Sequence, residues 1–419
     1  MAVNALVVGG GFREHALVRS LQRSPLVGRV VAAPGNAGIA EEAECVALSD
    51  AAAAAALARD LDALVLIGPE GPLAAGWADH LRSEGLLVCG PSRAAARLES
   101  SKADTKALMQ RLGVPTARSV TVPSLADADR VLDRWSGPVV VKADGLAAGK
   151  GVIMADDPAA GRAAVRQMME GRRFGAAADR VLLEECLEGP ELSAMAITDG
   201  RRLTWLPATQ DYKRLADGGQ GPNTGGMGAV GPHALWTPTL ADWLSYQVFE
   251  PILAELAREG RPFQGVLYAG LMMTPDGPRV LEWNARLGDP EAAVALALVT
   301  DDLAPYWVGA ANGELPHRPL ASAGAAVAVV MAAAGYPERS EPGAPVTYGP
   351  LGDGVVMLHA GTRRLADGRV VSGGGRTLAA VASAADAAQA RQRAYAEVAG
   401  VQFPGMMVRA DIAAEYCHS

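Results

Sequence analysis

The chain has 419 residues, of which half are hydrophobic and a fifth are charged, a composition typical of a folded globular protein. Its length predicts about three domains. The net charge of -8 argues against a general role in nucleic-acid binding, because affinity for a polyanion comes from clustered Lys and Arg side chains. Any phosphate that the protein binds must therefore be held by groups in a local site, and not by a broadly basic surface.

The first residues do not read as an export signal. Residues 1–8 carry no basic side chain, and their apolar run leads directly into a glycine turn, so we interpret them as a β-strand. The alanine-rich stretches 51–58 and 323–334 are too short to cross a bilayer. We expect a cytoplasmic protein without a membrane or nucleic-acid partner. The four cysteines lie far apart, without metal spacing, and are expected to be buried or free thiols.

The first hundred residues alternate apolar runs with helical stretches. We expect strands at 5–8, 30–33, 63–67 and 86–89, each ending in Gly or Pro. This alternation predicts a doubly wound parallel sheet that binds ligands at the carboxyl ends of its strands. Glycine-bearing loops at those ends should converge on one rim: residues 9–11, 34–38, 68–70 and 90–92.

The first glycine turn, residues 9–11, precedes a helix that begins near Arg13. Backbone N–H groups and the helix dipole can hold an anion at such a place. A dinucleotide fingerprint would need glycine where the chain has Glu14, and an acidic residue where the second strand ends in residues 33–34. We therefore favour a phosphate site here over a nicotinamide site.

A lysine-glycine loop follows in residues 138–152, which form a strand, a glycine turn and a second strand. Lys142 on the first strand can fix phosphate charge, and the bare backbone around Gly149 and Gly151 can close over a triphosphate. The loop is not of the Walker type, because Lys150 is followed by glycine instead of Ser or Thr. A glycine hairpin with solvated lysines is the alternative for this segment alone.

Two further segments carry groups that suit a nucleotide. Residues 181–191 form a strand that ends in acids and then an extended linker, which can meet adenine through its backbone and ribose through a carboxylate. Glu282, Asn284 and Arg286 alternate, which places them on one face of a strand. Carboxylate and amide oxygens suit Mg²⁺, and the arginine can clamp a carboxylate or acyl phosphate. An acidic turn and a charged edge strand are the alternatives for the two segments taken singly.

The order of these motifs resembles the ATP-grasp superfamily, and the chain is similar to the phosphoribosylamine:glycine ligase family over nearly its whole length. The matching strings are residues 13–17, 33–38, 68–70, 142–152, 210–214, 221–228, 288–291 and 359–362. The resemblance implies a multidomain protein of mixed α/β and α+β class. An N-terminal doubly wound domain would span 1–101. An ATP-grasp domain with a mobile lid at about 123–190 would span 102–325, and a small β-rich C-terminal domain 326–419.

The resemblance also implies roles for individual residues. ATP would be bound by Lys102, Lys142, Gly149, Lys150, Gly151, Glu184, Glu185, Leu187 and Glu191. Mg²⁺ or Mn²⁺ would be bound by Glu282 and Asn284, and catalysis would use Arg286, Lys142, Asp211 and Asn223. The substrates would be bound by Gly9, Gly11, Arg13, Gly35, Asn36, Gly68, Pro69, Glu70, Ser92, Asp211, Thr224, Arg286, Asp289 and Pro290.

The implied reaction joins glycine to 5-phosphoribosylamine with hydrolysis of ATP, and makes glycinamide ribonucleotide for purine biosynthesis in a monomeric enzyme. A carboxylate resists attack by an amine, so ATP would first convert glycine to an acyl phosphate. At Phe12, Gly219 and Gln220 the sequence differs from the residues that are usual in the family. These differences leave open the alternative of a paralogue that uses another amino acid or amine as its substrate. A nucleotide-binding regulator without turnover is the third hypothesis, and the full set of ATP-site residues disfavours it.

Overall fold

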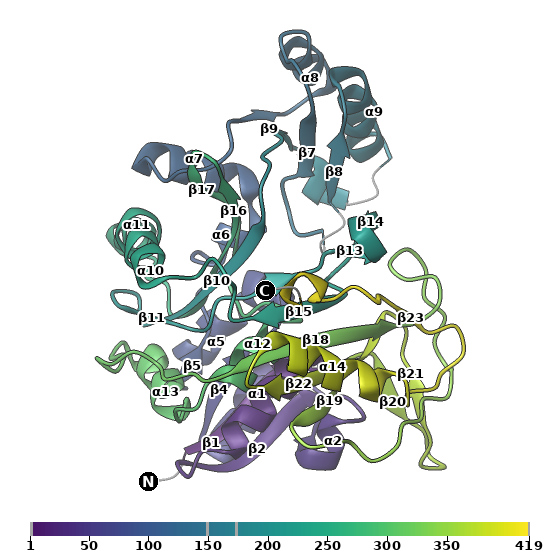
Figure 1. Ribbon diagram of the computed structural model, residues 1–419. Helices are drawn as coiled ribbons and strands as arrows, with labels where there is room; N and C mark the ends of the chain where they lie inside the picture. Colours follow the sequence, from purple (N-terminus) through teal and green to yellow (C-terminus); the bar gives the residue numbers. More distant parts are fainter. Residues whose placement is uncertain (1–2, 148–150, 172–174, 418–419) are drawn as a thin grey trace.

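The computed structural model describes residues 3–147, 151–171 and 175–417. Figure 1 shows three parts: a parallel sheet near the N-terminus, a unit that projects at the opposite end, and a C-terminal sheet that lies beside the first part. The mixed α/β architecture with an N-terminal parallel sheet confirms the predicted fold class.

The N-terminal sheet has the strand order β3-β2-β1-β4-β5, and all its pairings are parallel. Alternate residues of the central strand enter different hydrophobic clusters, Val7 one and Val8 the other, so both faces are covered. The predicted strand at 86–89 begins only at Val88. The elements are β1 (Val3–Gly9), α1 (Phe12–Gln22), β2 (Val27–Pro34), α2 (Ile39–Glu42), β3 (Glu44–Cys45), α3 (Ala51–Leu61), β4 (Ala63–Ile67), α4 (Glu70–Ala75), α5 (Trp77–Ser83) and β5 (Val88–Cys89).

The projecting unit is a four-stranded antiparallel sheet in the order β6-β9-β7-β8, with two helices and a hydrophobic cluster of its own. Most of the segment expected as the lid, about residues 123–190, lies in this unit, which begins earlier, at Ser119. Two helices precede it, α6 (Arg97–Ser100) and α7 (Lys102–Leu112). Its elements are β6 (Ser119–Val122), α8 (Leu125–Leu132), β7 (Val139–Ala143), β8 (Val152–Ala155), α9 (Pro158–Met169) and β9 (Val181–Glu185).

A second antiparallel sheet, in the order β11-β10-β16-β17, lies beneath the projecting unit and carries the predicted metal pair. The strand β17 ends at Asn284, so the prediction that Arg286 shares its strand face is wrong: Arg286 lies in the bend beyond the last strand pairing. The elements are β10 (Glu191–Thr198), β11 (Leu203–Trp205), α10 (Pro238–Leu244), α11 (Glu250–Arg258), β16 (Gly265–Thr274) and β17 (Gly277–Asn284).

The C-terminal sheet crosses the expected boundary between the second and third domains. The strand β15 (Gly228–Gly231) pairs with β18 (Ala325–Ala332), and β12 (Gln210–Asp211) pairs with β15. The sheet is completed by β19 (Val355–His359), β22 (Arg376–Ala384) and β23 (Met407–Val408), and α14 (Ala387–Val398) packs on it. Two small hairpins pair β13 (Arg214–Ala216) with β14 (Gln220–Asn223), and β20 (Thr362–Arg364) with β21 (Val370–Ser372).

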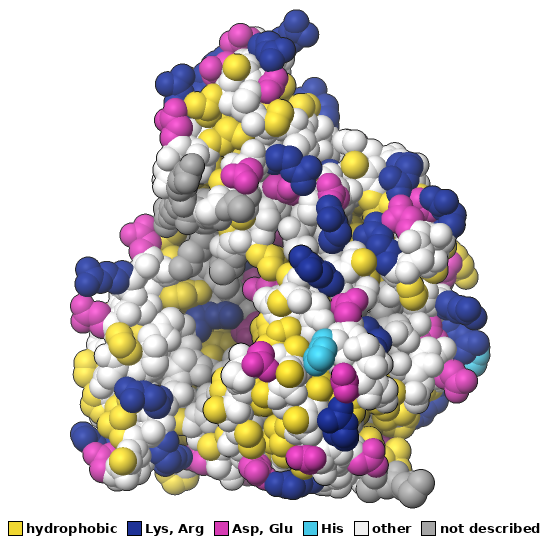
Figure 2. Space-filling model, turned by 180° about the vertical axis from the view of Figure 1, so that it is seen from behind, with side chains coloured by type: hydrophobic (Ala, Val, Ile, Leu, Met, Phe, Trp, Pro, Cys, Tyr) yellow, Lys and Arg dark blue, Asp and Glu magenta, His cyan; other side chains and the backbone are white. Residues whose placement is uncertain are grey.

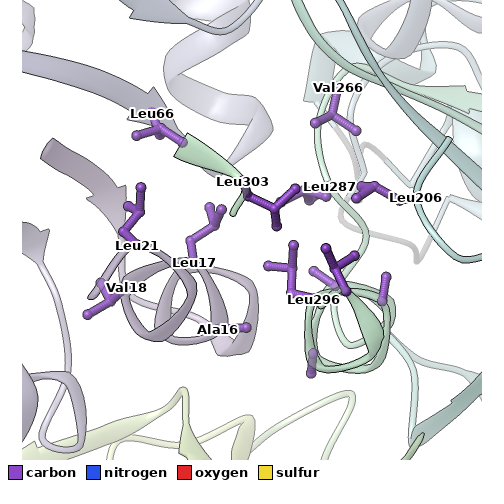
Figure 3. Packing of buried hydrophobic residues seen from close by; sticks show 14 of the residues in the cluster. Ala16, Leu17, Val18, Leu21, Leu66, Leu206, Val266, Leu287, Leu296 and Leu303 are labelled. Carbon is purple, nitrogen blue, oxygen red and sulfur yellow. The ribbon is translucent and has the colours of Figure 1, made fainter. Parts of the chain in front are cut away.

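The helix α12 (Glu291–Leu298) joins these parts. Its side chains are apolar on nearly every side, which is the pattern of a helix surrounded by protein. It packs against α1 and against β18, and Figure 3 shows Leu296 facing Leu17 of α1, with Leu287 and Leu303 above them. The helix α13 (Ala304–Asn312) follows. Within the described ranges, no helix combines the length and apolar character that a membrane span requires.

Candidate active site

Two lysines share one buried carboxylate at the base of the projecting unit. Lys142 Nζ on β7 lies 2.9 Å from Glu184 Oε2, and Lys106 Nζ on α7 lies 3.3 Å from Glu184 Oε1. All three side chains are less than a tenth exposed. Burial lowers the pKa of Lys106 to about 8, although Glu184 opposes the shift. With both lysines protonated, the three groups retain one positive charge, which favours an anion nearby.

This arrangement changes the role expected for Glu184. Its carboxylate points to the two lysines, not to a position free for ribose, so it orients Lys142. Lys106 was not predicted, although a signal was present: it lies four residues after Lys102 on α7, so both fall on one helix face. Glu185 Oε1 accepts from the backbone N–H of Arg118 at 2.7 Å, and the backbone N–H of Glu185 donates to Arg118 O at 3.0 Å, so Glu185 is tied to Arg118 just before the linker that carries Leu187.

Lys102 fastens the start of the lysine-glycine loop to α7. Its Nζ donates to Gly145 O at 3.0 Å, and its backbone N–H donates to Asp144 O at 3.0 Å. Burial lowers the pKa of Lys102, and the charge of Lys142 acts in the same direction. Gly151 O accepts from Ala143 N at 2.8 Å and closes the β7–β8 pair. The other predicted loop residues, Gly149 and Lys150, lie outside the described residues.

The predicted metal pair lies beside a protein cation. Lys213 Nζ lies 3.5 Å from Glu282 Oε1 and 2.7 Å from Glu191 Oε2. Lys213 lowers the pKa of Glu282 to about 2, and Lys142, Lys102 and Arg286 act in the same direction. Glu282 therefore faces a place that already attracts positive charge.

The ligand set at this place is small. In the parts of the chain that the structure describes, no three His, Cys, Asp or Glu side chains are grouped as a metal cage. A carboxylate and an amide would hold Mg²⁺ only with further oxygens, and nucleotide phosphates and water supply them in many such sites. The residues present fit that kind of metal site.

Arg286 is held by two carboxylates. Its Nη2 lies 2.9 Å from Glu99 Oε1, and its Nε lies 3.5 Å from Glu70 Oε2. Burial opposes the charge of the guanidinium, but Glu99 and Glu70 raise its pKa overall. A substrate carboxylate at Arg286 would have to compete with these two groups. Glu99 was not predicted, because it lies in α6 without any motif that marks it.

Asp211 lies in a second buried polar group with Glu291 and Tyr268. Tyr268 Oη donates to Glu291 Oε1 at 2.6 Å and is 2.8 Å from Ser193 Oγ. Burial raises the pKa of Asp211 well above its usual range, and the charge of Glu291 adds to the shift. Asp211 Oδ1 is buried without a hydrogen-bond partner among the described residues. These groups offer hydrogen-bonding atoms to a polar ligand.

The first glycine turn is filled by a side chain of the protein, which corrects the expectation of a free phosphate cradle. Glu14 is 1% exposed, and its Oε2 accepts from the backbone N–H of Gly11 at 2.5 Å. A Cβ at Gly9 or Gly68 would come within 2.6 Å of Glu14 Cδ. These glycines therefore make room for Glu14. Arg13 N lies 3.3 Å from Asp289 Oδ2, so a second N–H group at this helix end also meets a carboxylate.

Two other predicted substrate residues have their side chains engaged within the protein. Asn36 donates to Gly10 O and His359 O, and its Oδ1 accepts from two backbone N–H groups. Arg13 donates to Glu14 at 2.5 Å and to Leu287 O at 3.1 Å. These two side chains therefore hold the rim loops together.

The other residues that were predicted to contact the substrates lie in turns or at the ends of strands and helices around the same region. Thr224 Oγ1 donates to Lys213 O at 2.8 Å, and Ser92 Oγ accepts from Ala95 N at 3.2 Å. Gly35 N donates to Gly9 O at 3.1 Å, which joins two rim loops. Asn223 ends β14, Pro69 precedes α4, and Pro290 precedes α12. Figure 2 shows that the surface is hollowed between the projecting unit and the rest of the molecule.

Comparisons with known proteins fit this geometry along the whole chain. Residues 3–99 match the N domain of phosphoribosylglycinamide synthetase, residues 100–292 match its ATP-grasp (A) domain, and residues 326–415 match its C domain. The chain belongs to the phosphoribosylglycinamide synthetase family. The predicted membership is thereby confirmed.

Individual relatives of the phosphoribosylglycinamide synthetase family match end to end. The phosphoribosylamine–glycine ligase of Streptomyces coelicolor is 48% identical over 423 residues, which cover 99% of each chain. That of Phenylobacterium zucineum is 46% identical over 417 residues, which cover 98% of each. The crystal structure of the Thermotoga maritima phosphoribosylamine–glycine ligase is 34% identical, with a TM-score of 0.87, and covers 98% of this chain and 100% of its own.

The fold extends beyond the family. The biotin carboxylase domain of Hydrogenobacter thermophilus 2-oxoglutarate carboxylase is 18% identical, with a TM-score of 0.75, and covers 97% of this chain and 92% of its own. At that identity, the likeness concerns the fold alone.

Proposed function

We propose that this chain ligates glycine to 5-phosphoribosylamine, with hydrolysis of ATP to ADP and phosphate, and so makes glycinamide ribonucleotide in purine biosynthesis. The family and its end-to-end relatives support an ATP-dependent ligase that forms a C–N bond. The observation that carries the proposal is the group of cations at Glu282: Lys213 Nζ lies 3.5 Å from its Oε1, Lys142 Nζ donates to the neighbouring Leu281 O at 3.2 Å, and Lys213, Lys142, Lys102 and Arg286 lower its pKa. Such a group of cations around one carboxylate suits a triphosphate with a divalent metal.

The residues divide the work between two groups. Lys142, oriented by Glu184, and Lys102 would contact the phosphates of ATP. The linker from Glu185 to Leu187 would meet adenine through its backbone. Glu282 and Asn284 would hold Mg²⁺ or Mn²⁺, which supplies charge stabilisation at the phosphate oxygens. Glu191, freed from Lys213, would reach the ribose.

The second group would handle the substrates. Arg286 would bind the carboxylate of glycine, and the acyl phosphate formed there would face the amine of phosphoribosylamine. Asp211 and Asn223 would flank that amine, with Asp211 accepting its proton. The raised pKa of Asp211 suits a group that takes up a proton in a buried site.

The ribose phosphate has to be met at the rim loops, but not by the N–H group of Gly11, which Glu14 already holds. The loops at Gly35, Gly68 and Ser92 are the remaining places for it. A different amino acid or amine stays the alternative, and Gly219 and Gln220 motivate it because Gly219 ends the turn before β14 and Gln220 is the first residue of that strand. Phe12 no longer supports this alternative, because its ring is fully buried in a hydrophobic cluster.

We further propose that the enzyme acts as a monomer in the cytoplasm, with its N-terminal, ATP-grasp and C-terminal domains at 1–101, 102–325 and 326–419. The lid at about 123–190 would close over ATP and keep water from the acyl phosphate. The separate hydrophobic cluster of the projecting unit supports its movement as one body.

The test is a product assay with purified protein, ATP, Mg²⁺, glycine and freshly generated phosphoribosylamine. Glycinamide ribonucleotide should form with one ADP for each product. Glu282→Ala and Asn284→Ala should lose most turnover at limiting Mg²⁺ and keep a folded near-ultraviolet dichroism spectrum. A wild-type protein that uses a different amino acid in place of glycine would establish the alternative.

A further inference from the structure

Arg376, at the start of β22 in the C-terminal region, reaches into the candidate substrate site. Its guanidinium donates to Gly225 O and Gly226 O, and to Asp289 O at 2.6 Å. Its Nη2 lies 2.8 Å from Asp289 Oδ1. One side chain thus fixes the turn that follows Thr224 and the loop that carries Asp289.

The same side chain is tied to the first helix. The guanidinium carbon lies 5.5 Å from the centre of the Phe12 ring, which is fully buried. Asp289 holds Arg376 with one carboxylate oxygen and lies 3.3 Å from the backbone nitrogen of Arg13 with the other. Phe12 is therefore a platform for Arg376, which gives this unusual residue a structural reason.

The surrounding backbone is shaped for this guanidinium. A Cβ at Gly225 would lie 3.0 Å from the guanidinium carbon, so glycine leaves room for the close approach. Gly361 N donates to Arg376 O at 2.8 Å, and a Cβ at Gly361 would lie 2.9 Å from that same oxygen. The string 359–362 thereby anchors the backbone of Arg376. Burial opposes its charge, but Asp289 raises the pKa of Arg376 overall, so the guanidinium stays charged.

The turn that the Arg376 guanidinium contacts lies next to Asp211. A Cβ at Gly226 would lie 2.5 Å from Asp211 Oδ1 and 2.5 Å from Pro290 Cδ, so the position of Gly226 sets the space between these two residues. A shift of the turn would move the acceptor groups that face the amine. Geometry of this kind is sensitive, because a misplacement of about 1 Å can cost about 100-fold in rate.

We propose that Arg376 is a positioning residue through which the C-terminal region sets the substrate side of the active site, without contact with ATP. The inference rests on the proposed ligase reaction. It requires that removal of the Arg376 guanidinium weakens the use of glycine and phosphoribosylamine as substrates. Nucleotide binding should stay unchanged, because Lys102 and Lys142 belong to other elements.

The experiment uses the full chain with Arg376→Met and Arg376→Lys. We expect kcat/KM for glycine and phosphoribosylamine to fall by about 10- to 100-fold in Arg376→Met, while the Kd for MgATP changes less than about twofold. Arg376→Lys should recover only part of the loss, because one ammonium cannot reproduce a planar fork.

Arg393→Met is the matched control. Arg393 also lies in the C-terminal region, on α14, and donates to a backbone carbonyl, that of Ser383 at 3.0 Å, at the opposite end of β22 from Arg376. It should lower the Tm without the kinetic loss. Equal kinetics of Arg376→Met and wild type, or equal losses in the two Met variants, would overturn the inference. If Arg376→Met does not fold, Arg376→Lys decides by the same comparison. A wild type that makes no product contradicts the ligase proposal itself.

Discussion

At the residue scale, the glycines around Glu14 have a meaning different from the one their pattern suggested. Gly9 and Gly11 were expected to bind a phosphate in the first glycine turn and Gly68 to contact a substrate, but the three glycines leave space for a carboxylate of the chain. Composition could indicate that the backbone here must approach something closely. It could not indicate what, because Glu14 reads as an ordinary residue in the first turn of a helix.

This packing predicts that Gly68→Ala destabilises the protein by about 1–3 kcal/mol, the range of overpacked cores, because the new methyl group would overlap Glu14 Oε1. Gly71→Ala is the control: that glycine is exposed in α4, with open space around the added carbon. It should cost nothing. Urea unfolding of both variants measures the difference. Adding Glu14→Ala should relieve part of the Gly68→Ala loss, and strict additivity of the two changes would contradict the steric reason.

Glu282 gives a prediction on pH. Its pKa of about 2 lies below the ordinary value of 4.5, so its ion pairs stabilise the folded state fully above pH 4.5. That contribution is lost as the pH falls from 4.5 toward 2. Because the side chain is about a third exposed, we expect about 1 kcal/mol from it.

Glu282→Gln should therefore unfold more readily than wild type at pH 6, and the gap should narrow at pH 3. Urea midpoints at the two pH values measure it, with exposed Glu188→Gln as the control. A gap that widens toward acid would show that the lysines near Glu282 do not stabilise its charge.

At the element scale, the sequence predicted the strands that end in glycine turns, because apolar runs and breakers are local signals. The ends of the strands were predicted less accurately: β5 begins two residues later than expected, and β17 ends before Arg286. Glu282 and Asn284 lie on β17 as predicted, but Arg286 lies in the bend beyond it. The spacing of Lys106 from Lys102 marked it as a neighbour on the same helix face, but its pairing with Glu184 and that of Glu99 with Arg286 depend on how the helices pack, which the sequence pattern does not show.

The strand pairing at the base of the projecting unit predicts that the unit can be excised. Val122 pairs with Val181 across the antiparallel β6–β9 ladder, so a two-residue Asn-Gly turn can join them in place of residues 123–180. Nearly the whole hydrophobic cluster of the unit leaves with the excised segment, while Glu184 stays beside Lys106. We expect the shortened protein to unfold in one cooperative transition and to have no ligase activity, because Lys142 is gone. Aggregation on expression would mean that the unit supports the remaining fold.

At the scale of the whole molecule, three segments distant in sequence share one core. The same cluster contains Leu17 of α1, Leu296 of α12 and Val330 of β18, and Figure 3 shows the contact between the two helices. The three-part division was predicted from the sequence, yet the pairing of β15 with β18 was not. Nearly a hundred residues separate these strands, and an alternating or apolar pattern carries no information about its partner.

A chain that ends at Gly324 should consequently fail to fold, although the cut falls only one residue before the expected domain boundary. It would leave β15 without β18 and expose the side of α12 that faces the C-terminal sheet. Loss of the near-ultraviolet dichroism signal and of a sharp thermal transition is the expected result. A monomeric fragment with cooperative melting would contradict it, and the excised-lid variant serves as the comparison of similar size.

The strands β12 and β15 therefore limit how this architecture can be recombined. A chimaera that exchanged residues 326–419 with those of another ATP-grasp enzyme would replace four strands of a sheet and leave two behind. It would also remove Arg376 from Gly225 and Asp289. The exchangeable cassette is discontinuous: residues 210–231 have to travel with the C-terminal segment. Laboratory shuffling at the boundary of 325 and 326 should yield few functional hybrids, whereas grafts that include both segments keep the sheet and the contact of Arg376 with Gly225 and Gly226 intact.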